Sequence, residues 1–363
     1  MAETRTLKNY ASLSEIIKTI IVVICTIIVA GSGFNLLKAN VLPQVPTTFV
    51  AIIWGVASVI LIFYSLNLLA QIFPTKIYNK IVPYIFIGPA VLIMGWYLLL
   101  PTLRSLLLSF MDKTSTHFVW FDNYKYLFTD RSMLVSIRNT LIWLVCGTGF
   151  SVLIGLVVAI LAERSYIEKG AKTFIFLPMS ISLVGAGVIF KFMYAAKFGG
   201  AEQIGLLNAI ITSLGFEPQN WLGKAPWNNL FLIAIFVWLQ TGFALVVLSA
   251  ALKAVPEEML EAARIDGASE FMTLVKIVIP NIKASIISVS TTILLAALKC
   301  FDIVYSMTNG MFGTEVLASQ QYKQMFTFQN YGRGSAIAIL ILIGVSPVIY
   351  YNLKEFHNKE AFK

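Results

Sequence analysis

The chain has 363 residues, of which 58% are hydrophobic and only 12% are charged, and its mean hydropathy is +0.80. Because a soluble globular domain carries about 25% charged residues, this composition excludes water as the main solvent and predicts a polytopic membrane protein. The net charge of +9 is typical of cytoplasmic loops, and since no basic patch is interleaved with aromatic residues, we expect no nucleic-acid partner.

Eight apolar segments are long enough to cross the lipid bilayer as helices, because a hydrocarbon core about 30 Å thick requires about 20 apolar residues. The segments are 16–34, 50–73, 82–110, 137–161, 173–194, 228–252, 284–307 and 334–353. They predict an all-α protein with about eight transmembrane helices. Lys8 and Lys18 precede the short apolar centre of the first segment, an arrangement that is also the shape of a signal peptide, but no small-residue cleavage site follows, and we expect a retained helix.

The distribution of Lys and Arg predicts the orientation of these helices. Most of these residues lie before the first segment, at the C-terminus, and in 74–81, 162–172 and 253–283. Because positively charged loops stay in the cytoplasm, both termini and residues 253–283 are expected on that side. An even number of spans agrees with this orientation.

The longest polar stretches fall on the outer face in this arrangement. Within one of them, residues 205–215 predict a helix with Leu206, Ile210 and Leu214 on one stripe. Such a helix either lies in the membrane interface or packs on the helical bundle.

Residues 256–280 predict a charged helical hairpin in this otherwise apolar chain. Gly267 is expected to end the first helix in the left-handed conformation, which glycine adopts without steric cost. Ser269 can then cap a second helix over 270–279, which we expect to stop at Pro280. The predicted unit is therefore a helix, a glycine turn and a second helix.

Charged residues of the hairpin predict one ion pair and one unusual carboxylate. Glu261 and Arg264 are three residues apart on one helical face and can form an ion pair. Asp266 lies at the negative end of the helix dipole, where a carboxylate is unfavourable. It could accept hydrogen bonds from the N–H groups that start the second helix, it could fix the shape of the hairpin for a partner, and the two roles are compatible.

The hairpin resembles the cytoplasmic EAA loop of the permeases of ABC importers. The matching residues are Glu261, Ala262, Ala263, Asp266, Gly267, Ala268 and Pro280. Further stretches resemble the larger maltose-type permease of the carbohydrate branch: NYKYLF (123–128), RNTLIW (138–143), FLPMSIS (176–182), VWLQTGF (237–243) and FDIVYSMTNG (301–310). Within that branch, WLQTGFALVVLSAAL together with LKCFDIVYSMTNG is most similar to α-glucoside permeases.

The resemblance covers about 82–353 and implies an ABC-transporter type I permease core containing the EAA loop 253–283. It leaves 1–81 as an N-terminal extension with two transmembrane helices and 354–363 as a cytoplasmic tail. It also implies a bacterial inner-membrane location and three partners: a second permease subunit, a cytoplasmic ATPase dimer and an extracytoplasmic solute-binding protein. The six EAA-loop residues before Pro280 would contact or shape the interface with the ATPase.

Catalysis is not expected in this chain itself. It contains no phosphate-binding G-x-x-x-x-G-K-[ST] sequence, and neither a metal site nor a catalytic triad emerges from its residues. The resemblance implies that ATP and Mg are used by the partner ATPase, and that this chain binds no cofactor.

Polar and aromatic residues inside the spans are candidates for substrate binding. Trp238, Gln240 and Phe243 lie in the sixth span, in a segment that resembles the family's substrate-contacting region. In the corresponding part of the seventh span, Ala296 and Ala297 replace the larger polar and aromatic residues of the maltose permease. The resemblance therefore implies α-glucosides, such as sucrose, trehalose, maltose-like disaccharides or glucosyl-polyol osmolytes, without naming the sugar.

Lys299 and Asp302 lie three residues apart in the outer half of the seventh predicted span. On one helix they would neutralise each other, as a structural ion pair or as part of the substrate site. An alternative function uses the same pair: an ion-coupled secondary sugar carrier that acts alone would need such a cation site. That alternative leaves the cytoplasmic hairpin unexplained.

Overall fold

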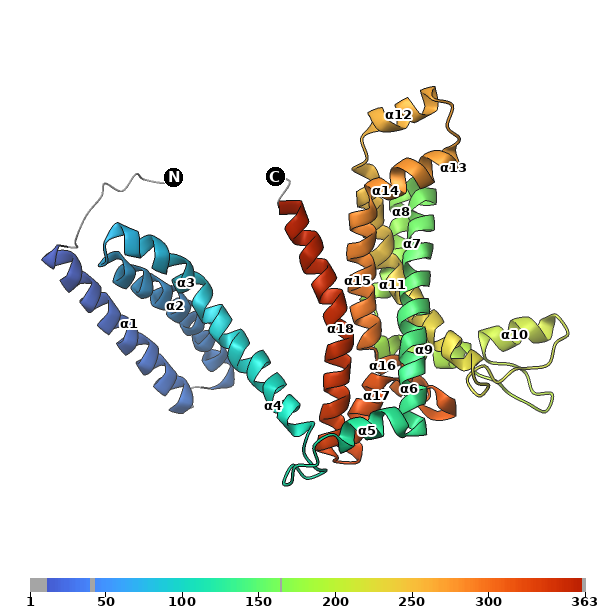
Figure 1. The fold of residues 1–363 in the computed structure, drawn as a ribbon, viewed down its shortest axis with the longest axis horizontal. Coiled ribbons are helices and arrows are strands. Elements are labelled where there is room, and N and C mark those ends of the chain that lie inside the picture. The colour runs from blue at the N-terminus through green and yellow to red at the C-terminus, as the bar shows by residue number, and fades with distance from the viewer. Residues whose placement is uncertain (1–11, 40–42, 164, 361–363) are drawn as a thin grey trace. The chain divides into compact units, whose positions relative to one another are not determined.

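The computed structural model describes residues 12–39, 43–163 and 165–360 (Figure 1). The regular elements of these residues are helices, and one isolated β-bridge pairs Met111 with Phe118. Six described helices are long and apolar enough to cross a membrane, and two bent helix pairs raise the number to up to eight. The prediction of an all-α fold with about eight spans is confirmed.

The chain divides into two compact units, one ending at Leu103 and the other beginning at Arg104. The predicted boundary after residue 81 lies inside α3 (Thr75–Met94). That helix continues through a π turn into α4 (Leu100–Leu108), so the division falls near the C-terminal end of the third span.

The first unit is built on two long helices, α1 (Leu13–Ala39) and α2 (Gln44–Gln71), followed by α3. The hydroxyl groups of Thr26 and Ser65 are 2.7 Å apart between α1 and α2, where both side chains are buried. Interhelical hydrogen bonds of this kind hold transmembrane helices together, because lipid supplies no hydrophobic driving force between them.

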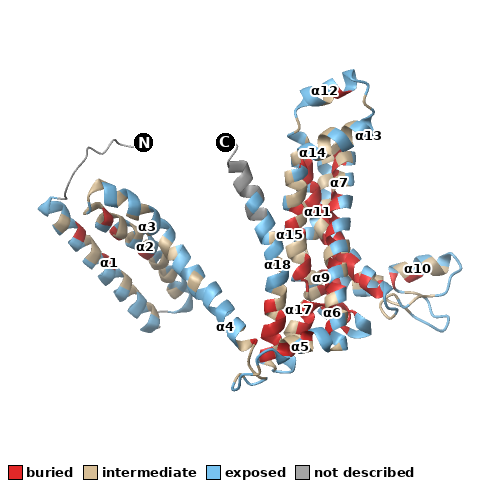
Figure 2. Ribbon diagram, in the orientation of Figure 1, coloured by how far each residue is buried: buried red, intermediate tan, exposed pale blue. Residues whose placement is uncertain are grey.

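The second unit is a bundle around α11 (Trp227–Lys253), the helix with the most buried residues in Figure 2. Its other elements are α5 (Asp122–Thr129), α6 (Arg131–Ile142), α7 (Thr148–Glu163), α8 (Glu168–Phe176), α9 (Leu183–Met193), α10 (Leu206–Ser213), α12 (Glu257–Ile265), α13 (Glu270–Thr273), α14 (Ile279–Asn281), α15 (Lys283–Leu298), α16 (Asp302–Met307), α17 (Leu317–Tyr322) and α18 (Tyr331–Glu360). Short π or 3-10 turns join several of them.

Close packing of α7 on α11 depends on a small residue. A Cβ atom added to Gly155 would lie 2.5 Å from the Cβ of Ala244 and 3.1 Å from the backbone nitrogen of Leu245. The two helices can therefore approach each other only because Gly155 has no side chain. In the π turn before α7, the ring of Trp143 meets that of Phe236 of α11 edge to face at 5.9 Å between centroids.

Two predicted spans differ from single straight helices. In the fifth, α8 and α9 meet at 102°, and the hydroxyl of Ser182 accepts a hydrogen bond from Gly185 N at 3.0 Å to start α9. In the seventh, the segment before α15 meets it at 70°, and α15 itself ends at Leu298 rather than continuing to 307. Apolar composition predicts the length of such spans but not where they bend.

The end of the bundle opposite the hairpin is tied together by buried polar side chains. Asn139 is fully buried, and its side-chain nitrogen donates to the carbonyl oxygens of Gly313 (2.7 Å) and Glu315 (2.8 Å). The predicted helix in 205–215 is present as α10, and Leu206, Ile210 and Leu214 are all exposed. This apolar stripe therefore does not pack on the bundle.

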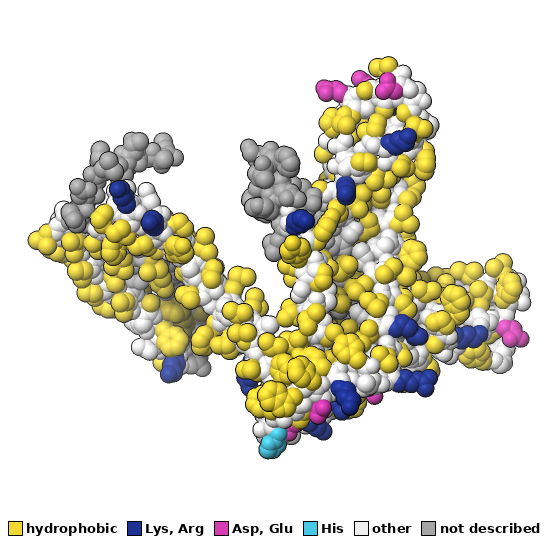
Figure 3. All heavy atoms as spheres, viewed as in Figure 1, with side chains coloured by type: hydrophobic (Ala, Val, Ile, Leu, Met, Phe, Trp, Pro, Cys, Tyr) yellow, Lys and Arg dark blue, Asp and Glu magenta, His cyan; other side chains and the backbone are white. Residues whose placement is uncertain are grey.

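Apolar side chains cover the sides of the bundle between two ends that carry charges (Figure 3). Acidic side chains gather over α12 at one end, where the hairpin extends beyond the last turn of α7 and the first turn of α15 (Figures 1 and 3). An apolar belt between charged ends is the surface that a lipid bilayer requires.

Candidate functional site

The turn of the hairpin is a complete Schellman motif. Gly267 has a φ angle of +76°, its N–H donates to Arg264 O at 3.1 Å, and Ala268 N donates to Ala263 O at 3.0 Å. The hydroxyl of Ser269 then accepts a hydrogen bond from Met272 N at 3.3 Å at the start of α13. The predicted left-handed cap and the predicted N-cap are both confirmed.

The turn determines which side chains the hairpin displays. Glu261, Ala262, Asp266 and Gly267 are exposed, Ala268 is partly buried, and Ala263 is only 4% exposed. On either side of the turn, the apolar side chains of Ile265 and Phe271 are 85% and 75% exposed. A carboxylate flanked by exposed apolar groups forms a surface that fits a protein partner. The sequence reading did not single out Ile265.

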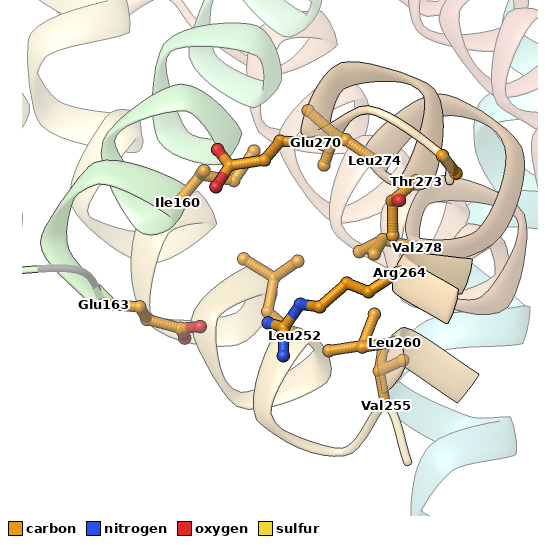
Figure 4. Close-up of a pocket in the computed structure, with 11 residues that line it drawn as sticks. Ile160, Glu163, Leu252, Val255, Leu260, Arg264, Glu270, Thr273, Leu274 and Val278 are labelled. Carbon is orange, nitrogen blue, oxygen red and sulfur yellow. The ribbon is translucent and has the colours of Figure 1, made fainter. Parts of the chain in front are cut away.

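Arg264 does not pair with Glu261, contrary to the sequence-based expectation: no ion pair joins them in the described part of the chain. Its side chain instead reaches into a cavity of ≈ 200 Å³ between the hairpin and the ends of α7 and α11. Figure 4 shows the guanidinium group facing Glu163 across this cavity. Arg264 can line this cavity only because the ends of α7 and α11 lie next to the hairpin, which helical spacing alone does not reveal.

Asp266 does not cap the second helix. Ser269 occupies that position, and among the described residues no hydrogen bond ends on the Asp266 carboxylate. Asp266 is instead the exposed C-cap residue of α12, with its backbone N–H bonded to Ala262 O. The bracing role is therefore wrong, and the role in shaping the hairpin for a partner stays a prediction.

The second helix of the hairpin runs further than 279. It passes from α13 through a π turn (Leu274–Val278) into α14, which contains Pro280 and ends at Asn281. The wider π turn precedes the proline, whose missing N–H removes one helical hydrogen bond. The bend into α15 follows at Ile282, whose side chain is buried.

A network of charged side chains holds the helix ends below the hairpin. Glu168 Oε1 lies 2.5 Å from the Nζ atoms of both Lys172 and Lys253, while Ser249 Oγ donates to Glu163 Oε1 at 2.8 Å. Lys172 also hydrogen-bonds Ser249. The network links α7, α8 and α11, and sequence reasoning missed it because its members are up to 86 residues apart.

The predicted substrate residues of the sixth span do not converge. Trp238 is 37% exposed and meets Phe190 edge to face at 5.3 Å, while Gln240 is half-buried on another side of the helix. Phe243 packs against the buried core of the bundle. Their roles in substrate binding stay predictions.

Lys299 and Asp302 are separated by the end of a helix. Lys299 is the exposed C-cap residue of α15, and Asp302 is the first residue of α16, so they do not occupy adjacent turns of one helix. In the described residues no ion pair joins them. The expected mutual neutralisation is therefore wrong, because the spacing of three residues has its usual meaning only within a continuous helix.

A bundle with an apolar belt, bent spans and an exposed charged hairpin at one end defines a membrane-embedded subunit of a transport system. A family model described as "Binding-protein-dependent transport system inner membrane component" matches residues 151–361, and the chain belongs to this family. The matched region includes the hairpin and every span from α7 onward. Membership confirms the predicted resemblance to the permeases of ABC importers and the location in a membrane.

Two curated relatives cover most of the chain. The osmoprotective compounds uptake permease protein GgtC of Synechocystis sp. is 51% identical over 278 residues, which are 77% of this chain and 100% of that protein. The alpha-glucoside transport system permease protein AglF of Rhizobium meliloti is 42% identical over 325 residues, 86% of this chain and 97% of that protein.

A solved structure shares the fold. It belongs to a bacterial ABC transporter involved in the import of the acidic polysaccharide alginate, with a TM-score of 0.66 and 19% sequence identity. The similarity covers 77% of this chain and 99% of that chain. At this level of identity the likeness concerns the fold alone.

Proposed function

We propose that this chain is a transmembrane permease subunit of an ATP-driven importer for carbohydrates of the α-glucoside class. The observation that carries the proposal is the hairpin, in which the left-handed Gly267 turns two helices so that Glu261 is exposed. A rigidly capped, partly apolar projection is suited to docking in a groove of another protein.

The proposed partners follow from what this chain lacks and displays. A cytoplasmic ATPase dimer would bind the hairpin through Glu261 and would use ATP and Mg, while a second permease subunit would complete the channel. An extracytoplasmic solute-binding protein would deliver the sugar to the opposite end of the bundle. Both termini would then lie in the cytoplasm of a bacterial cell, and this chain would bind no cofactor and catalyse no reaction.

The proposed substrate class rests on the relatives. One is named for osmoprotective compounds and another for α-glucosides, and each covers more than three quarters of this chain. Glucosyl-polyol osmolytes and α-linked disaccharides share a glucosyl ring, which is the common element that one binding site could recognise.

The alternative of an ion-coupled carrier acting alone has lost its main support. It required Lys299 and Asp302 as a coupled cation site, and these residues lie in separate helices without an ion pair between them. It also gives the exposed hairpin no role.

Uptake measurements in sealed vesicles test the proposal. We expect the chain to copurify with an ATPase and a second permease, and labelled α-glucoside to accumulate only with ATP and the solute-binding protein. Replacing Glu261 by Arg should abolish uptake while the protein remains folded in the membrane. Accumulation that continues without ATP and stops when the ion gradient is dissipated would establish the carrier function instead.

A further inference from the structure

The seventh span is interrupted near its outer end. Helix α15 has 16 residues and ends at Leu298, and the backbone is non-helical up to Phe301, before α16 begins at Asp302. At 1.5 Å per residue the interruption lies about 24 Å from the start of α15, within a hydrocarbon layer about 30 Å thick. Non-helical backbone is tolerated at that depth only where protein buries it or where it lines a water-filled cavity.

A cavity of ≈ 380 Å³ opens beside this interruption, between the end of α15, α17 and α18. Ligand-binding pockets have volumes of about 300–1,000 Å³. The cavity under the hairpin, at ≈ 200 Å³, falls below that range. Two small residues, Ala318 of α17 and Ala338 of α18, leave part of the space open.

One wall of this cavity is aromatic. Phe301 and Tyr322 line it with ring centroids 4.8 Å apart. The cluster is extended by Tyr305, 5.1 Å from Phe301, and by Phe326, 5.1 Å from Tyr322. The face of an aromatic ring carries partial negative charge. It attracts the C–H groups on the apolar side of a pyranose ring, which carry partial positive charge.

Polar groups with spare hydrogen-bonding capacity lie next to this wall. The side-chain nitrogen of Gln321 lies 3.7 Å from the sulfur of Met325, and a thioether is a weak acceptor. Lys299 lines the same cavity, and within the described ranges its ammonium group has no ion-pair partner. An amide offers both a donor and an acceptor, and the ammonium group offers further donors, so together they match the hydroxyl groups of a sugar.

The helix that carries Gln321 and Tyr322 is held firmly. At its start, Leu317 N donates to Thr140 Oγ1 at 2.9 Å, and the side chain of Gln320 donates to Ser132 Oγ at 2.6 Å. These bonds attach α17 to α6. Binding groups placed on such a fixed helix need little ordering when a ligand arrives.

We propose that this cavity is a carbohydrate subsite in which Phe301 and Tyr322 stack on a glucosyl ring while Gln321 and Lys299 bind its hydroxyl groups. The inference rests on the proposed transport function and adds a site to it. It is distinct from Trp238, Gln240 and Phe243, which do not line this cavity. A phospholipid would also use Lys299 and the aromatic rings, but its acyl chains would leave the Gln321 amide unsatisfied.

The test uses the purified complex with its accompanying subunits, reconstituted in vesicles of a neutral phospholipid. Maltose, sucrose and trehalose are the probes, and the sugar that the wild type transports fastest is used for equilibrium binding and uptake. Gln321→Leu removes the amide at nearly constant size, and Ala338→Leu fills the cavity. Ala234→Leu makes the same change at an exposed position of α11 and is the matched control.

We expect Gln321→Leu to weaken sugar binding about tenfold, the effect of one lost hydrogen bond. Ala338→Leu should weaken it at least as much, whereas Ala234→Leu should match the wild type, with equal melting temperatures for all variants. Unchanged binding and uptake in both cavity variants would overturn the subsite. Loss of copurifying phospholipid with unchanged sugar binding would assign the cavity to lipid and also overturn it. No uptake of any probe by the wild type would instead contradict the proposed α-glucoside transport.

Discussion

Substitutions at Gly267 provide a graded test of the coupling hairpin, because the strain can be worked out from the backbone alone. Gly267 has φ +76°, and a Cβ atom there would have no neighbour within 4 Å, so any penalty arises from the left-handed conformation and not from a clash. That conformation costs an L-residue about 1–2 kcal/mol, which lowers the ratio of formed to unformed turn by a factor of about 5–30. Asn tolerates it better than Ala, and Val tolerates it worse.

Proline at this position adds a second defect. It fixes φ near −65° and removes the N–H that donates to Arg264 O, so the Schellman motif cannot form. Sugar uptake should therefore fall in the order Asn, Ala, Val, Pro.

The assay compares ATP-driven sugar uptake with ATP hydrolysis in the same vesicles, since a deformed hairpin should lose transport without losing the assembled ATPase. The amount of folded complex in the membrane, measured for each variant, is the control. Wild-type uptake by the Val and Pro variants would refute the reasoning and would separate the hairpin from transport.

Three further predictions concern the bundle and its outer loop. Gly155→Ala should lower the melting temperature of the complex, because the added Cβ meets Ala244 at 2.5 Å, whereas Gly149→Ala, which meets nothing within 4 Å, should not. Asn139→Leu should cost about 1–3 kcal/mol of stability, measured by thermal unfolding, because the carbonyl oxygen of buried Glu315 loses its donor and that of Gly313 keeps only the 3.5 Å contact with Asn229; an unchanged melting temperature would contradict this. In the outer loop, backbone N–H groups, chiefly that of Thr116, lower the pKa of Asp112 from 3.8 to about 2. The ionised carboxylate therefore stabilises the loop above pH 3.8 and loses this effect as the pH falls toward 2, so the hydrogen-exchange protection factors of the loop, taken relative to the intrinsic rate at each pH, should fall over that window in the wild type and not in Asp112→Asn.

Features that depend on neighbouring residues could be predicted from the sequence. The cap at Gly267 and the start of the second helix at Ser269 are set by conformational preferences of those residues and their immediate neighbours. The lengths of the spans follow equally from composition, since bilayer thickness sets the number of apolar residues.

Features that depend on distant segments could not be predicted. Arg264 turns toward the end of α7 instead of toward Glu261, and nothing within the hairpin encodes that direction. The break after Leu298 was also missed, because an apolar run reads the same whether or not its backbone is continuous. That break separates Lys299 from Asp302 and places Lys299 in a cavity with residues of α17.

The hairpin is attached to the bundle at two points. It leaves the bundle from α11 and returns to it through the 70° bend before α15. A pull on α12 therefore exerts torque on both helices at once. Since α15 ends at the cavity that contains Lys299, a tilt of α15 at the hairpin end would move a wall of that cavity at its other end. If an ATPase binds the hairpin as proposed, its movement could thus reach the opposite end of the bundle through a single helix.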